Sequence, residues 1–336
     1  MLKRIMAVLI AALFCVPMML SAAALDIERS ESYTISESTD SAGRVIRSVE
    51  REIDSDRLMS ADETREMLRS LGMPEQAIEG MDEKDLARYA ASPNIYTSDA
   101  YIRTDSLGRM TYVTELEAVM GAAEQKSEFS PLASGSDTYR DSYMNLYFVA
   151  ADLDDGNGTY LFATNALWLT MPDFRWKDGV GAVAQDVAIN YSTMGGYYQY
   201  RQERYYNGVL QSTLLPAQTR TTLSRYDFQA ATDSTGTFYG VGTVVELPND
   251  TGAPVDGMEI IYTDYFVHAE FEANIRHPTL ETYFNAIGSY VHKTFGVSGE
   301  VSIAVDTTGT VAVGLGLQPK AHCEGRHVPV FVHYAP

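Results

Sequence analysis

The second half of the chain is a succession of short segments rich in Tyr, Phe, Thr and Val, separated at regular intervals by Gly and Asp. Such segments favour extended backbone, because β-branched and aromatic side chains pack well on a pleated surface, and Gly and Asp favour turns. The expected strands between residues 139 and 275 are SYMNLYFVAADL, TYLFATNALWLT, GAVAQDVAIN, YYQYRQERYY, TRTTLSRYDFQAA, GTFYGVGTVVEL and GMEIIYTDYFVHAEFEANI. Many short strands with frequent turns predict a sandwich or barrel.

One helix is expected to interrupt these strands, beginning at Pro278, which suits a first helical turn. Four apolar residues after it recur at helical spacing, namely Leu280, Phe284, Ile287 and Val291. A hairpin over residues 301–317 and a last strand, HVPVFVHY, follow. The predicted fold is therefore mainly β, a β-sandwich with one inserted helix. Jelly-roll and immunoglobulin-like topologies both remain open.

The N-terminus has the pattern of a secretory signal peptide. A short basic region precedes an apolar run over residues 5–20, and Ala22 and Ala24 form an A-x-A cleavage site before Leu25. The apolar run is shorter than the roughly 20 residues that a membrane-spanning helix needs. We therefore expect residues 1–24 to be removed and the rest to be exported, as in a secreted or surface-associated bacterial protein. An uncleaved anchor is the alternative.

Composition divides the remaining chain into four regions. Residues 25–58 are polar and lack an apolar pattern, which predicts a flexible or partly extended lead. Residues 59–126 predict a small α+β region, whose first helix has a capping box at Ser60. Residues 127–138 combine Ser, Pro and Gly without periodicity, as in a linker. Residues 139–336 then form the β-sandwich domain.

Charge and cysteine content exclude some functions. Loss of Lys3 and Arg4 with the leader would change the formal net charge from −20 to −22. A surface this acidic repels phosphate backbones, which excludes nucleic acid as a partner, and it favours solubility. Only Cys323 would survive cleavage, so no internal disulfide is possible. A large domain buries enough apolar surface to fold without one.

The stretch KAHCEGRH, residues 320–327, is a candidate metal site. His322, Cys323 and His327 supply the nitrogen and sulfur ligands that zinc prefers. Consecutive strand residues point to opposite faces, so these side chains converge only if the chain turns at Gly325. The spacing of the two histidines matches no standard zinc motif. A connecting turn with an ordinary thiol is the alternative.

The same stretch could instead carry a reactive thiol, because Arg326 and His327 would favour the thiolate of Cys323. The order His322, Cys323, Arg326 resembles the His-Gly-Cys-x-Arg motif of the L,D-transpeptidases, which are cysteine transpeptidases of bacterial cell walls. The resemblance implies an exported enzyme with Cys323 as nucleophile. It covers this stretch alone, lacks the glycine and places the arginine one position later, so we do not transfer the activity.

A second candidate is TDYFVHAEFEAN, residues 263–274, whose alternation predicts a half-buried strand. One face carries His268, Glu270 and Glu272, with neighbours about 6.5–7 Å apart. Such a group could hold a cation or act as an acid–base pair. A solvated sheet face explains the pattern equally well.

The third candidate is a binding surface in the aromatic segments 168–179 and 195–208. Aromatic rings edged by polar groups bind sugars, because sugar faces are apolar while their hydroxyls need polar partners. They also suit protein interfaces. The predicted surface consists of Trp168, Trp176, Tyr197, Tyr198, Tyr200, Arg201 and Tyr205. The alternative places Trp168 and half of the tyrosines in the core.

These features predict an exported bacterial protein that is a non-enzymatic binding or structural module, with glycan, cell wall or another protein as partner. Two alternatives come from other classes. A metal- or thiol-dependent enzyme acting on the cell wall would use Cys323, with zinc as a possible cofactor, or His268. A β-pore-forming protein would use the amphipathic hairpin at residues 301–317.

Overall fold

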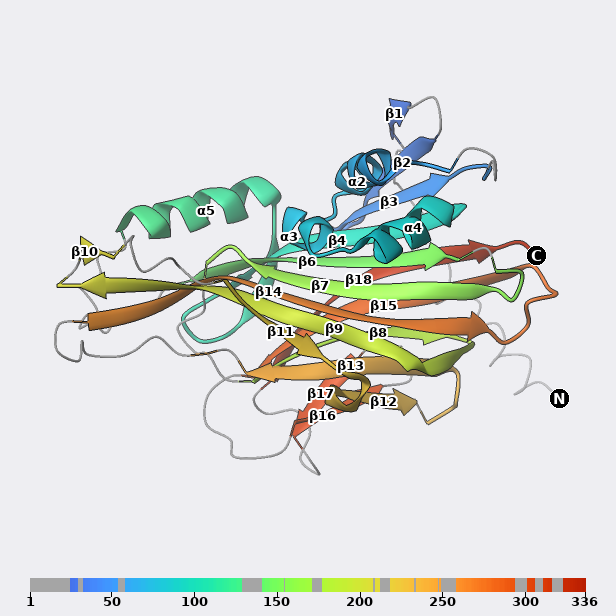
Figure 1. The fold of residues 1–336 in the computed structure, drawn as a ribbon. Coiled ribbons are helices and arrows are strands. Elements are labelled where there is room, and N and C mark those ends of the chain that lie inside the picture. Colours follow the sequence, from blue (N-terminus) through green and yellow to red (C-terminus); the bar gives the residue numbers. More distant parts are fainter. Residues whose placement is uncertain are drawn as a thin grey trace.

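The computed structural model confirms a mainly β protein built from packed antiparallel sheets (Figure 1). It describes residues 25–29, 33–53, 58–128, 141–153, 155–170, 177–207, 209–211, 218–232, 234–246, 248, 258–293, 301–305, 311–315 and 323–336. The expected leader, residues 1–24, and most of the expected linker, residues 127–138, lie outside this part of the chain.

In the residues so described, no helix combines the length and the apolar character that crossing a membrane requires.

The larger sheet, sheet A, has eleven strands among the described residues, in the order β1-β2-β3-β4-β6-β7-β14-β9-β10, with β5 paired to β4 and β11 paired to β9. Its strands are β1 (Leu25–Arg29), β2 (Thr34–Thr39), β3 (Val45–Glu50), β4 (Asn94–Thr104), β5 (Met110–Val113), β6 (Ser142–Asp152), β7 (Thr159–Trp168), β9 (Val187–Tyr206), β10 (Val209–Leu210), β11 (Gln218–Leu223) and β14 (Met258–Ile275). Each pair of neighbours is antiparallel.

The smaller sheet, sheet B, packs against one face of sheet A. Its order is β12-β13-β8-β15-β18. The strands are β8 (Lys177–Gln185), β12 (Phe228–Thr232), β13 (Phe238–Glu246), β15 (Thr282–Lys293) and β18 (Cys323–Tyr334). The main hydrophobic core lies between the sheets. Phe162 of β7 meets Phe284 of β15 edge-on, with 6.4 Å between ring centroids.

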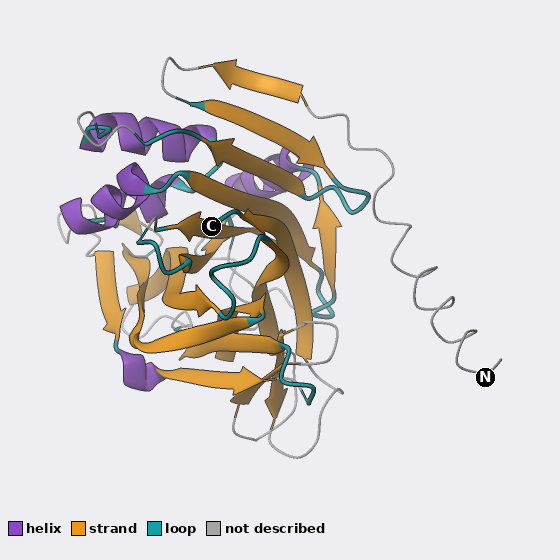
Figure 2. Ribbon diagram, turned by 90° about the vertical axis from the view of Figure 1, so that its right-hand side faces the viewer, coloured by secondary structure: helices purple, strands orange, loops and turns teal. Residues whose placement is uncertain are grey.

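Helices cover part of the opposite face of sheet A (Figures 1 and 2). They are α2 (Ala61–Ser70), α3 (Glu75–Glu79) and α4 (Glu83–Ala91). A second core joins Met67 and Leu68 of α2 to Val149, Leu161 and Phe266 of the sheet. The capping box expected at Ser60 is present at the start of α2. Together, the two sheets and these helices make three layers.

A further helix, α5 (Glu115–Glu128), lies against β4 and β6 on the side of sheet A away from sheet B (Figure 1). Ala118 and Ala122 of α5 pack on Tyr143 of β6. The hydroxyl of Thr114 accepts a hydrogen bond from the backbone N–H of Glu117 at 3.2 Å, which caps the first turn.

The hairpin expected at residues 301–317 is confirmed by the pairing of β16 (Val301–Val305) with β17 (Val311–Leu315). It contacts β8, β12 and β13 of sheet B. A short connection and alternating apolar residues are sufficient to predict such a hairpin from local sequence.

The predicted inserted helix is wrong, because residues 282–293 form β15. This strand pairs with β18 on one side and with β8 on the other. Phe284, Ala286 and Tyr290 point to the main core, at the two-residue period of a strand. The spacing of the apolar residues in this segment fits both the period of a helix and the two-residue period of a strand. Hydrogen bonds to β8 on one side and to β18 on the other favour the strand.

In the lead that was predicted to be flexible or partly extended, residues 34–50 form the strands β2 and β3, so the extended alternative applies there. Ile35 and Val49 lie opposite each other and are buried in the second core. A strand with one covered face needs few apolar residues, which is why the segment looks polar. Because β3 pairs with β4 and β4 with β6, one sheet runs across the boundaries expected at residue 58 and at residues 127–138.

The close approach of β8 and β13 yields a stability prediction. A Cβ at Gly181 would lie 2.4 Å from the carbonyl oxygen of Val241, whereas a Cβ at Gly195 would meet nothing nearer than 3.9 Å. We expect Gly181→Ala to lower the free energy of unfolding by about 1–3 kcal/mol. Gly195→Ala should change it by less than about 1 kcal/mol. Equal denaturant midpoints for the two variants would contradict the packing of these strands.

Candidate functional site

The residues predicted as one binding surface lie on different faces of the fold. Trp168 is only 2% exposed and meets Tyr290 edge-on in the main core, with 5.6 Å between ring centroids. Tyr198 and Tyr200 are half-buried and pack against the same core. Tyr197 is buried on the opposite face of sheet A, beneath the helices. The core location of Trp168 agrees with the alternative interpretation of the sequence.

Two further members of that predicted surface, Arg201 and Tyr205, lie on β9. Arg201 is exposed and lies 3.8 Å from the carboxylate of Asp264. Tyr205 is half-buried and donates a hydrogen bond to Glu203 at 2.9 Å. Trp176 lies outside the described residues. The structure therefore does not bring the six described residues together on one face.

The two predicted metal ligands that the structure describes, Cys323 and His327, lie apart along one strand. His322 lies outside the described residues, and β18 runs through Gly325, where a turn was expected. Cys323 and His327 pair with Lys293 and Ser289 on one continuous strand. Their Cα atoms are therefore about 13 Å apart.

That separation prevents Cys323 and His327 from sharing a zinc ion, whose ligands lie about 2 Å from the metal. It also separates Cys323 from the base expected for a reactive thiol. Nδ1 of His327 lies 2.9 Å from the hydroxyl of Ser289 instead. Among the described residues, no group of three or more His, Cys, Asp or Glu side chains is placed to hold a metal.

A row of buried polar side chains crosses the outer face of sheet A, opposite sheet B. Strand register places each member directly across from the next. This polar row consists of Asp99 of β4, Tyr147 of β6, Asn165 of β7, His268 of β14 and Tyr197 of β9. Every member is 9% exposed or less. The predicted alternation of β14 is therefore correct, but helices cover the face that was expected to be solvated.

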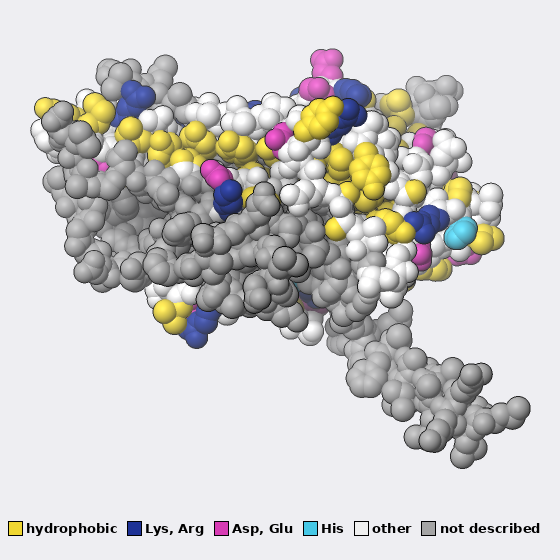
Figure 3. All heavy atoms as spheres, turned by 90° about the horizontal axis from the view of Figure 1, so that it is seen from below, with side chains coloured by type: hydrophobic (Ala, Val, Ile, Leu, Met, Phe, Trp, Pro, Cys, Tyr) yellow, Lys and Arg dark blue, Asp and Glu magenta, His cyan; other side chains and the backbone are white. Residues whose placement is uncertain are grey.

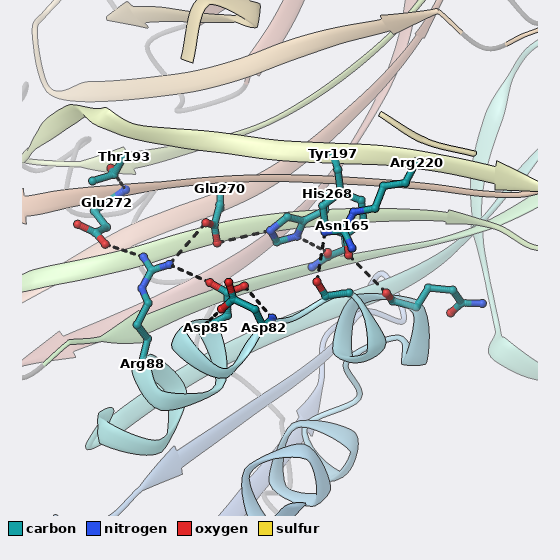
Figure 4. A network of polar contacts seen from close by, with 12 residues as sticks. Asp82, Asp85, Arg88, Asn165, Thr193, Tyr197, Arg220, His268, Glu270 and Glu272 are labelled. Carbon is teal, nitrogen blue, oxygen red and sulfur yellow. Dashed lines mark hydrogen bonds and ion pairs between the residues drawn. The ribbon is translucent and has the colours of Figure 1, made fainter. Parts of the chain in front are cut away.

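His268 occupies the middle of the helix-covered part of the polar row (Figure 4). Its Nδ1 lies 2.8 Å from Oδ1 of Asn165, and its Nε2 lies 3.5 Å from a carboxylate oxygen of Glu270. The ring also packs on Tyr197, with 5.2 Å between centroids. Each ring nitrogen therefore faces an oxygen atom of a neighbouring side chain.

Arg88 of α4 links the helices to β14 (Figure 4). Its guanidinium lies 2.6 Å from Glu272, 3.5 Å from Glu270 and 3.8 Å from Asp85. Burial by itself would raise the pKa of Glu270, but His268 and Arg88 outweigh burial and hold that pKa below its usual value. Burial, with the nearby charge of Glu270, raises the pKa of Asp85. One guanidinium thus holds three carboxylates together.

The opposite end of the network joins α3 to sheet A. Arg220 of β11 stacks on the ring of Tyr197 at 3.5 Å and donates a hydrogen bond to the carbonyl of Gly80. The hydroxyl of Tyr197 donates to the carbonyl of Gln76 at 3.4 Å. The cluster in Figure 4 therefore fastens the helical layer to three strands. His268 and Tyr197 are buried beneath that layer, whereas Arg220 and Asp82 at the edge of the cluster are exposed.

A second histidine–carboxylate cluster lies inside the main core. Asp178 of β8 lies 2.7 Å from Nδ1 of His292 and accepts a hydrogen bond from Tyr290 at 2.5 Å. None of the three is more than 1% exposed. Burial and the neighbouring Asp178 raise the pKa of Tyr290 well above its usual value. This cluster was missed because the segment that begins at Pro278 and ends before Gly296, which contains Tyr290 and His292, was predicted to be helical.

The outer face of sheet B carries three stacked rings, which we call the aromatic ladder: Tyr283 of β15 with Phe331 and His333 of β18. Tyr283 lies 4.5 Å from His333 and 5.6 Å from Phe331 between centroids, with interplanar angles of 10° and 16°. Tyr283 and Phe331 are 55% and 52% exposed. Glu281 accepts a hydrogen bond from the hydroxyl of Tyr283 and lies 3.0 Å from Nε2 of His333.

Comparison with known proteins gives no family for the chain. No family model matches it, and no curated protein matches it. Among solved structures, the chain is similar at 8% identity to the collagen-binding domain from a Staphylococcus aureus adhesin, covering 53% of this chain and 89% of that one with a TM-score of 0.22.

Two further solved structures have comparably low scores. One is AvmM, which catalyses macrocyclization in alchivemycin A biosynthesis, at 9% identity over 54% of this chain and 82% of that one, with a TM-score of 0.22. The other is Clostridium perfringens delta-toxin, at 8% identity over 71% and 88%, with a TM-score of 0.16. Scores this low carry no argument about fold or activity.

The network around Arg88 predicts unequal effects for two arginines. Arg88→Ala leaves the half-buried carboxylates of Glu270 and Glu272 without their cation, so we expect the free energy of unfolding to fall by about 1–3 kcal/mol. Arg69 pairs with Glu66 and Glu75 on the exposed side of α2, where water screens the charges. Arg69→Ala should therefore shift the denaturant midpoint little. Similar shifts for both variants would refute the linking role of Arg88.

Asp99 predicts a pH dependence with a definite sign. Its carboxylate pairs with Arg47 at 2.6 Å, but burial outweighs this pair and raises the pKa to about 6. The unfolded value is near 3.9, so the folded state binds the proton more tightly and gains stability as pH falls from about 6 to about 4. As pH falls from about 6 to about 4, the free energy of unfolding of the wild type should rise by about 2 kcal/mol relative to that of Asp99→Asn. Chemical denaturation of both proteins at each pH measures this difference.

Asp105 provides a control of opposite sign. Burial opposes its ionisation, but Arg109 and two backbone N–H groups together outweigh burial and hold its pKa below the usual value. The stability that it contributes is present at neutral pH and is lost as pH falls through its folded pKa. If Asp99→Asn and Asp105→Asn changed the pH profile in the same direction, the assignment for Asp99 would be wrong.

Proposed function

We propose that the chain is an exported, non-enzymatic binding module that contacts its partner through the aromatic ladder. The leader pattern of residues 1–24 supports export, and the mainly β architecture is compatible with a binding module. The observation that carries the proposal is the stack of three rings on the outer face of sheet B, in which Tyr283 and Phe331 are exposed and His333 is half-buried.

Exposed rings in a fixed arrangement favour binding because little entropy is lost when a ligand contacts them. Tyr283 stacks with two neighbours and donates its hydroxyl hydrogen to Glu281 at 3.2 Å, which restricts its rotation. Aromatic side chains of this kind contribute much of the free energy of many interfaces. Figure 3 shows further hydrophobic side chains on the described part of the underside, with scattered charged side chains among them.

The placement of the two buried titratable clusters, one around His268 and one around Asp178, supports binding rather than catalysis. His268 lies beneath the helical layer, and Asp178 and His292 lie inside the main core. Catalysis requires a reacting group within hydrogen-bond distance of its substrate. The aromatic ladder has no such restriction, because its rings are already at the surface.

Binding and export are tested with the chain produced in a bacterial host. Mass spectrometry of the exported protein should give a chain that begins at Leu25. The purified protein should then bind isolated cell-wall material or immobilised extracellular proteins in a sedimentation or interferometry assay. We expect Tyr283→Ala/Phe331→Ala to weaken that binding at least about tenfold, since stacked rings act as binding hot spots.

Tyr226→Ala is the matched control, because Tyr226 is 81% exposed and lies outside the ladder. Its binding should equal that of the wild type, and all variants should keep the thermal midpoint of the wild type. Binding that survives the double substitution, or no binding to any of these materials, would contradict the proposed function.

A further inference from the structure

We infer that the ligand of the aromatic ladder is a neutral carbohydrate chain, and that two amides on the same face of sheet B complete its site. This inference rests on the proposed function and specifies its ligand. It places the sugar site on β8, β15 and β18, away from the aromatic segments at residues 168–179 and 195–208.

The amides lie in a cross-strand row with one ring of the ladder. Asn285 of β15 is directly opposite Phe331 of β18, and its amide nitrogen donates to Oε1 of Gln185 on β8 at 3.4 Å. The adjacent row on the same face holds Tyr283 opposite His333. Asn285 is exposed and Gln185 is half-buried, so both amides are accessible beside the rings.

This arrangement matches the two kinds of surface on a pyranose ring. The C–H face of a sugar is apolar and stacks on an aromatic ring, while its hydroxyl groups need donors and acceptors at the edge. An amide side chain offers two donor hydrogens and two acceptor lone pairs, and the long contact between Asn285 and Gln185 uses one of each. The remaining positions are suited to hydroxyl groups.

The size of the surface favours a sugar over a protein partner. A stable protein interface covers about 800 Å² on each side and has an apolar centre. Beside the ladder, the described exposed apolar side chains on the same two strands and the preceding turn add only Leu280 to Tyr283 and Phe331. Amide and carboxylate groups border the rings. A flat strip of this kind fits an extended oligosaccharide.

Charge selects a neutral ligand. Glu281 lies at the edge of the ladder, where its carboxylate accepts from Tyr283 and is within 3.0 Å of His333. A carboxylate accepts strong hydrogen bonds from sugar hydroxyls and repels phosphate or uronate groups. The net charge of −20 adds to that repulsion. Acidic polysaccharides should therefore bind more weakly than neutral ones.

The test is isothermal titration calorimetry of the purified chain with neutral hexasaccharides of β-1,4-linked glucose and of β-1,4-linked N-acetylglucosamine, with polygalacturonate as the acidic comparison. We expect at least one neutral hexasaccharide to bind and polygalacturonate to bind at least about tenfold more weakly. Tyr283→Ala and Phe331→Ala should each weaken sugar binding about tenfold. Asn285→Ala should weaken it a fewfold, as expected for one lost hydrogen bond.

Glu281→Gln tests the charge argument separately, because the amide keeps the shape and removes the repulsion. This variant should reduce the preference for the neutral sugar over polygalacturonate, while Tyr226→Ala leaves every affinity unchanged. If no neutral hexasaccharide binds, yet ladder-dependent binding to an extracellular protein persists, the inference fails and the proposed function stands. If sugar binds but the ladder variants bind equally well, the assigned site is wrong.

Discussion

Two central strands, β6 and β7, must be covered on both faces, and the rest of the fold follows from this requirement. Every residue of β6 is buried, and Phe148 and Tyr147 point to opposite sides of sheet A. Burial of apolar surface contributes about 25 cal/mol per Å², so exposure of either face would remove much of the free energy of folding. Sheet B covers one face and helices α2–α4 cover the other.

The interface between sheet A and helices α2–α4 encloses charged and polar groups as well as apolar ones, which distinguishes it from the main core. Burying the carboxylates of Glu270 and Glu272 is favourable only because Arg88 compensates their charge. Ion pairs depend on geometry far more than apolar contacts do. The network therefore fixes where the helices sit on the sheet, whereas the apolar contacts supply most of the attraction.

Local sequence was sufficient for the elements that depend on neighbouring residues. The hairpin β16–β17 and the cap at Ser60 follow from short-range rules. β15 was predicted incorrectly because Leu280, Phe284, Ile287 and Val291 satisfy helical spacing, and only the pairing with β8 and β18 makes the strand the better solution. Its Thr, Tyr and Val content was the signal that favoured a strand.

The candidate sites depend on register between distant strands, which a single sequence does not encode locally. Glu281 and His333 are 52 residues apart, and they meet only because β15 pairs with β18 in one particular register. Trp168 illustrates the complementary difficulty. Aromatic residues serve both cores and binding surfaces, so composition identified an aromatic region without showing that this tryptophan faces inward.

The pairing of β7 with β14 has a consequence for the order of folding. Asn165 and His268 are adjacent in space but 103 residues apart in the chain, so β7 emerges long before its partner exists. Folds dominated by such long-range pairing form slowly, and an unpaired apolar strand edge invites association with other chains. The strong negative charge of the chain then also acts during folding, because repulsion between partly folded chains reduces their aggregation until β7 has paired with β14.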